Sequence, residues 1–143
     1  MADVCKCDVD RRTFVSQATL AAAALLLGAC GENDNFIAGP RPLNATIKVG
    51  DYPALANVNG AVAITLDNTP VAIVRTGAIT FLALSRICPH QGGVIIPNSG
   101  SWVCTGHGAQ FALRGDWTGG QQTWDMARWQ SSYNSSTDIL TIG

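Results

Sequence analysis

The sequence has few charged residues, only two histidines and no apolar run long enough to cross a membrane. Charged side chains make up 13% of the 143 residues, and the formal net charge is −1. Neither a basic surface for nucleic acid nor an acidic disordered segment is therefore expected. The most apolar run, about residues 18–29, is shorter than the roughly 20 residues that a spanning helix needs. This composition favours one domain with at most a short appendage.

The first 29 residues follow the order of an export signal. Two adjacent arginines in "DRRTFVS", residues 10–16, resemble the twin-arginine signal. The apolar run comes next and ends in "LGAC", residues 27–30, which resembles a bacterial lipobox. In signals of that kind the cysteine is lipidated and becomes the first residue of the mature chain. We therefore expect residues 1–29 to be the signal and Cys30 to carry the lipid.

A flexible tether is expected next, at residues 30–43, because this stretch contains Gly, Asn and Pro and has no periodicity. The signal and the tether together predict an extracytoplasmic protein, on the periplasmic or outer face, anchored to a membrane by lipid. The alternative for the N-terminal segment is an ordinary Ala/Leu-rich helix that belongs to the fold.

Residues 44–143 read as short strands separated by turns, with no sustained helical period. Two apolar runs, at 71–75 and 79–85, predict a hairpin that is buried on both faces. One helical turn fits residues 123–130, and Asp125 and Arg128 are expected to form a solvent-exposed pair. The pattern predicts an all-β fold. Further strands are predicted at residues 45–49, 61–67, 101–104, 110–113 and 137–143.

Both histidines lie close to a cysteine, in "CPHQGG" (residues 88–93) and "CTGHGAQF" (residues 104–111). The two motifs fall on glycine-rich loops, at about residues 86–111, where the backbone can approach another group closely. Two thiolates and two imidazoles are the ligands of a [2Fe–2S] centre in which histidines replace the cysteines of one iron. The spacing therefore predicts a metal centre with mixed ligands.

Two other interpretations of the motifs remain open at this point. A structural zinc ion also takes two cysteines and two histidines, although usually with C-x₂₋₄-C and H-x₃₋₅-H spacing. Such a chain would be a zinc-stabilised surface binding module without redox activity. A disulfide between Cys88 and Cys104 suits an exported protein, but it leaves both histidines unexplained.

The two motifs, with the hairpin before them, resemble the Rieske iron–sulfur proteins over residues 44–143. The resemblance implies that Cys88 and Cys104 bind one iron of a [2Fe–2S] cluster. It implies that His90 and His107 bind the other iron. It further implies a small antiparallel β sandwich that carries the cluster at the tip of a loop subdomain.

The sequence departs from the quinol-oxidising members of that family at four positions. Gly93 and Gly106 stand where those members carry a cysteine pair that links the loops by a disulfide. Ala109 and Phe111 stand where they carry a serine and a tyrosine that donate hydrogen bonds to sulfur. Such bonds stabilise the reduced cluster. We therefore expect a potential in the lower half of the family range of about −150 to +300 mV.

The resemblance implies a one-electron carrier, or a small redox subunit of a larger oxidoreductase, with no substrate of its own. Its partners would be a redox enzyme or a cytochrome, and no nucleic acid. A self-contained Rieske oxygenase needs a second iron held by two further histidines and a carboxylate. The chain has no histidine left for such a site.

Overall fold

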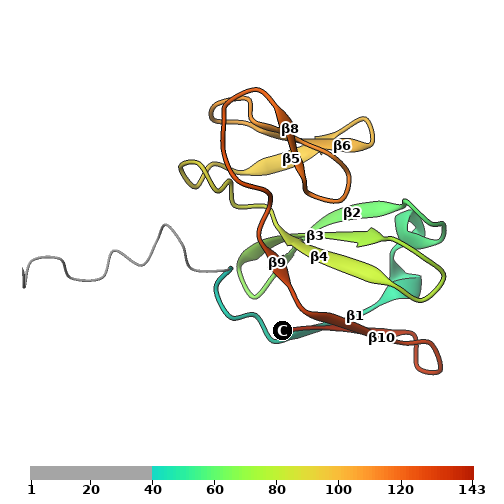
Figure 1. The fold of residues 1–143 in the computed structure, drawn as a ribbon. Coiled ribbons are helices and arrows are strands. Elements are labelled where there is room, and N and C mark those ends of the chain that lie inside the picture. Colours follow the sequence, from blue (N-terminus) through green and yellow to red (C-terminus); the bar gives the residue numbers. More distant parts are fainter. Residues whose placement is uncertain (1–39) are drawn as a thin grey trace, which may run out of the picture. The chain divides into compact units, whose positions relative to one another are not determined.

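The computed structural model describes residues 40–143, which form three antiparallel sheets with no α-helix in that range (Figure 1). The predicted signal, Cys30 and most of the predicted tether lie outside the described residues. Two short 3₁₀ turns, Val49–Asp51 (η1) and Pro53–Leu55 (η2), precede the second strand. No helix of the described part is both long and apolar enough to cross a membrane. The predicted all-β fold is confirmed.

The base sheet joins the two ends of the described chain. Its strand order is β1–β11–β10. Ala45 on β1 pairs with Ile142 on β11, so the last strand returns to the first. The bounds are β1 Ala45–Lys48, β10 Ser131–Asn134 and β11 Ile139–Ile142.

The middle sheet contains the predicted hairpin, and its strand order is β2–β3–β4–β9. Strand β3 is buried on both faces: Val71 and Ile73 point into one core, and Ala72 and Val74 into another. This alternation follows from the two-residue period of a strand. The bounds are β2 Ala61–Leu66, β3 Thr69–Arg75, β4 Phe81–Ser85 and β9 Arg128–Trp129.

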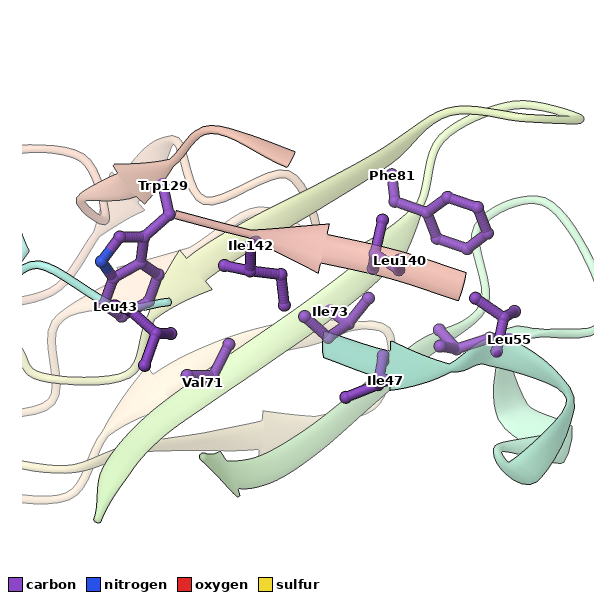
Figure 2. Close-up of a cluster of buried hydrophobic side chains, with 11 residues drawn as sticks. Leu43, Ile47, Leu55, Val71, Ile73, Phe81, Trp129, Leu140 and Ile142 are labelled. Atoms are coloured by element: carbon purple, nitrogen blue, oxygen red, sulfur yellow. The ribbon is translucent and has the colours of Figure 1, made fainter. Parts of the chain in front are cut away.

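The base core fills the space between the middle sheet and the base sheet (Figure 2). Ile73 of β3 and Leu140 of β11 are fully buried there, and Trp129 of β9 donates its indole N–H to the carbonyl of Arg41. Every one of the eleven buried side chains is apolar. They are Leu43, Ile47, Val49, Leu55, Val71, Ile73, Phe81, Ala83, Trp129, Leu140 and Ile142.

The loop sheet packs on the other face of the middle sheet, and its strand order is β5–β6–β7–β8 (Figure 1). The contact between them is a second core, called here the site core. Trp102 and Phe111 are neighbours across β6 and β7 and are the largest side chains in it. The bounds are β5 Ile95–Asn98, β6 Ser101–Cys104, β7 Gln110–Phe111 and β8 Trp117–Gly119.

The predicted helical turn and the predicted ion pair after β8 are both wrong. Arg128 lies on β9, which pairs with β4, and it binds Asp116 at 2.8 Å rather than Asp125. Asp125 instead accepts the backbone N–H of Trp117 at 2.7 Å. Without a helical turn, the side chains at positions 125 and 128 do not share a face, so each finds a partner near β8.

Candidate functional site

The first loop, residues 86–94, connects β4 to β5 and closes in a tight turn at Cys88. The N–H of Cys88 donates to the carbonyl of Gly93 at 2.7 Å, and the N–H of Gly92 donates back to the carbonyl of Cys88 at 2.9 Å. Gly92 has a φ of +71°, which favours glycine. A bridge between Ile87 and Val94 fixes the base of the loop. The turn holds Cys88 at its buried end.

The second loop, residues 104–109, repeats this turn. The N–H of Cys104 donates to the carbonyl of Ala109 at 2.8 Å, and the N–H of Gly108 donates to the carbonyl of Cys104 at 3.1 Å. Gly108 also has a φ of +71°. Sequence reasoning missed this equivalence, although a glycine four residues after each cysteine was the signal for it. Two copies of one turn therefore present the two cysteines in the same way.

Backbone contacts lock the two loops against each other. Both the N–H and the hydroxyl of Thr105 donate to the carbonyl of Val94, each at 3.0 Å. A Cβ atom added to Gly93 would lie 3.0 Å from the sulfur of Cys104 and 3.8 Å from the Cα atom of Gly106. The absence of a side chain at position 93 therefore lets the two loops approach closely.

The four cysteine and histidine residues of the two motifs lie as two pairs, one of histidines and one of cysteines. The Nδ1 atoms of His90 and His107 lie 3.3 Å apart, with the ring planes nearly perpendicular at 84°. His90 is half-buried and His107 is exposed. Cys88 and Cys104 are each only 2% exposed and belong to the site core. The loops thus place a pair of sulfurs inside and a pair of imidazoles outside.

The two thiols differ in acidity although the turns match. Burial raises the pKa of Cys88, and contact with Cys104 raises it further. The backbone of His90 and Gln91 acts in the opposite direction but does not outweigh these effects. Burial also acts to raise the pKa of Cys104, but the backbone of His107, the thiol of Cys88 and the backbone of Gly106 outweigh it and lower the pKa. Backbone donors aimed at sulfur are the environment that stabilises a thiolate or a metal-bound sulfur.

These four side chains fit a two-iron centre in which the two irons have different ligands. Both cysteines are free thiols, so no disulfide joins them. Within residues 40–143 no three His, Cys, Asp or Glu side chains converge as the ligands of one metal ion. The site has one pair of sulfurs and one pair of nitrogens, which is the division of ligands in a cluster with one histidine-bound iron.

A family comparison identifies the domain. The sequence profile of the Rieske [2Fe-2S] domain matches residues 46–130, which include both loops. A search of curated proteins gave no significant match.

Solved structures share the fold. The plasma membrane Rieske protein PetC3 from the cyanobacterium Synechocystis PCC 6803 is 22% identical, with a TM-score of 0.54 over 71% of this chain and 99% of that chain. The quaternary ammonium Rieske monooxygenase CntA is 16% identical, with a TM-score of 0.56 over 71% of this chain and 31% of that chain. Naphthalene 1,2-dioxygenase is 15% identical, with a TM-score of 0.53 over 69% of this chain and 25% of that chain.

This chain therefore corresponds to less than a third of either oxygenase chain. At these identities the structural likeness establishes the fold alone. The profile, by contrast, covers more than half of the chain. The protein belongs to the Rieske [2Fe–2S] family, whose domain binds a [2Fe–2S] cluster.

Proposed function

We propose that the chain transfers single electrons through a [2Fe–2S] cluster held by the first and second loops. Cys88 and Cys104 bind one iron in this proposal. His90 and His107 bind the other. The protein acts as an electron carrier or as the small redox subunit of a larger oxidoreductase, and it has no substrate of its own.

The proposal rests on one observation: two turns with the same hydrogen-bond pattern bring cysteine next to cysteine and histidine next to histidine. The paired sulfurs of Cys88 and Cys104 are buried in the site core, where solvent does not reach them. The imidazoles of His90 and His107 lie with their Nδ1 atoms 3.3 Å apart on the outer side. When bound, the cluster supplies a site that accepts and releases one electron.

The protein's own residues set the conditions for that exchange. The backbone of His107 and Gly106 lowers the pKa of the Cys104 thiol and so favours negative charge on that sulfur. The exposed His107 gives a redox partner, such as an oxidoreductase subunit or a cytochrome, a short approach to the histidine-bound iron. Electrons would pass through this face.

The direct test is the metal content and spectrum of protein purified without oxygen. We expect two irons and two acid-labile sulfides per chain, a brown-red colour, and an EPR signal that appears on reduction by one electron. A colourless protein with one zinc per chain would instead support the zinc-stabilised binding module, and the electron-transfer proposal would fall.

We also propose that the protein is exported and tethered by lipid on Cys30. This rests on the order of arginines, apolar run and "LGAC" in the sequence. The Synechocystis protein of similar fold is a plasma membrane Rieske protein, which is the same kind of setting. Cell fractionation of the wild type and of Cys30→Ala tests this. We expect the variant to leave the membrane fraction, and unchanged membrane association would refute the anchor.

A further inference from the structure

Among the side chains of residues 40–143, one buried polar atom has no hydrogen-bond partner, and it is the hydroxyl oxygen of Thr123. A buried hydroxyl left unpaired destabilises the fold, so native structures rarely contain one. Thr123 lies in the third loop, residues 120–127, which joins β8 to β9. Its unpaired hydroxyl indicates a partner that the described protein atoms do not supply.

The third loop is fastened at both ends to the surroundings of the cysteines. At one end Gly120, with a φ of +71°, packs so tightly on the second loop that an added Cβ would lie 2.0 Å from the carbonyl oxygen of Gly108. At the other end Met126 is 2% exposed and belongs to the site core together with both cysteines. Thr123 is halfway between these two attachments.

The hydroxyls next to the two turns already have partners, and that of Ser85, just before the first loop, accepts the N–H of Ile87. The hydroxyl of Thr105 already donates to the carbonyl of Val94. Ala109 and Phe111, both fully buried in the site core, have no donor on their side chains. Thr123 therefore carries the buried hydroxyl without a partner in the described part of the chain, and it lies in the third loop, whose Gly120 packs on the second loop.

We propose that the hydroxyl of Thr123 donates a hydrogen bond to a sulfur of the bound cluster or of its cysteine ligands, and so raises the reduction potential. The inference rests on the proposed function, since the acceptor arrives with the cluster. Sulfur carries more negative charge after the cluster takes up an electron from its redox partner. A hydrogen bond to that sulfur therefore stabilises the reduced state more than the oxidised state. Thr123 is in this sense a positioning residue and not a ligand.

The test compares Thr123→Val, which removes the hydroxyl at nearly constant volume, with Thr123→Ser, which keeps it. Thr141→Val is the matched control, because Thr141 is exposed on β11 of the base sheet. We expect Thr123→Val to lower the midpoint potential in protein-film voltammetry. If the preference for the reduced state became tenfold weaker, the midpoint potential would fall by 59 mV for one electron. Thr123→Ser and Thr141→Val should keep the wild-type potential.

Pulsed EPR of the reduced protein in deuterated water gives a second readout. We expect one exchangeable deuteron coupled to the cluster to disappear in Thr123→Val and in the smaller Thr123→Ala, and to remain in Thr123→Ser. If both hydroxyl-free variants keep that deuteron and the wild-type potential at full iron and sulfide content, the inference is wrong and the proposed function stands. A wild type without iron and sulfide would instead refute the proposed function.

Discussion

The two cores on either side of the middle sheet differ in the chemistry of their buried side chains. The base core consists only of apolar side chains, with Ile73, Leu140 and Ile142 fully buried at its centre (Figure 2). The site core includes two free thiols, Cys88 and Cys104, among its buried side chains. Burying a polar or ionisable group is costly unless a partner satisfies it. The base core has no such group among its buried side chains, whereas the site core contains two thiols that the proposed cluster would engage.

Strand β3 serves both cores, and this explains why the sequence of the middle sheet is so apolar. The side chains on both of its faces are shielded from solvent: Val71, Ala72, Ile73 and Val74 are all fully buried. The base core can thus keep the sheet in place even when the site core is disturbed. The comparison predicts that changes on the two sides have different consequences.

The largest expected effect is the loss of the cluster in Cys88→Ser or Cys104→Ser. A hydroxyl is a poor replacement for an iron-bound thiolate, so we expect iron, labile sulfide and visible absorption to fall to background. Because the base core contains neither residue, far-UV circular dichroism should still show a folded β protein. Cys30→Ser should keep the full cluster. Full iron content in either loop variant would contradict the ligand assignment.

The next largest effect separates the two faces of the middle sheet. Ile73 and Leu84 are both fully buried, Ile73 in the base core and Leu84 in the site core. We expect Ile73→Ala and Leu84→Ala each to lower the free energy of unfolding by about 2–5 kcal/mol. Only Leu84→Ala should also change the visible spectrum or the reduction potential under conditions where the protein is folded. Denaturant unfolding and spectroscopy on the same samples check this.

An equal shift of spectrum in both variants would show that the two cores are not independent. Unchanged spectra in both would show that packing under the loops does not reach the cluster.

A smaller effect is expected from crowding of the third loop. Gly120 and Gly100 both have a positive φ, but an added Cβ would be 2.0 Å from the carbonyl oxygen of Gly108 in the first case and free of neighbours within 4 Å in the second. We expect Gly100→Ala to cost about 1–2 kcal/mol for the backbone alone. Gly120→Ala should cost about 1–3 kcal/mol more and should speed loss of the cluster. Equal stability of the two variants would contradict the close contact between the loops.

Much of this architecture could be predicted from the sequence, because its signals are local. The hairpin of β3 and β4 follows from two apolar runs and a short turn, and β11 lies within the last strand predicted at residues 137–143. The resemblance to the Rieske family is confirmed by a profile over residues 46–130. Both loop motifs lie within that range.

The features that the sequence did not predict depend on contacts between distant segments. The third loop has no periodic pattern, and its position depends on the fit of Gly120 against Gly108. The ion pair of Arg128 with Asp116 depends on where β9 joins the middle sheet. The burial of the Thr123 hydroxyl depends on the same loop. Local spacing carries no information about such contacts.

A change at Ala109 tests the site core without disturbing its packing much. Ala109 is fully buried, and its carbonyl accepts the N–H of Cys104. The resemblance to the quinol-oxidising Rieske proteins places a serine that donates to sulfur at this position. We expect Ala109→Ser to raise the midpoint potential by tens of millivolts, since a preference of about 1.4 kcal/mol for the reduced state equals 59 mV for one electron. Voltammetry of both proteins checks this, and no upward shift would show that the hydroxyl does not reach the sulfur.

The smallest expected effect is confined to the base sheet and depends on pH. The N–H of Gly50 and then the hydroxyl of Tyr133 donate to the carboxylate of Asp138 and lower its pKa. A carboxyl whose pKa is lower in the folded state stabilises the fold above its unfolded pKa of about 3.9, and this contribution disappears as the pH falls through the folded pKa.

Asp138→Asn removes the charge and keeps a residue type that tolerates the φ of +61° at this position. We therefore expect a melting temperature slightly below that of the wild type at neutral pH, and a difference that shrinks as the pH falls below about 4. Melting curves across this range measure the effect, with the visible spectrum as a control. The spectrum should not change, because Asp138 contacts the base sheet and not the loops. A difference that grows in acid would reverse the sign of the argument and show that the charge of Asp138 does not stabilise the fold.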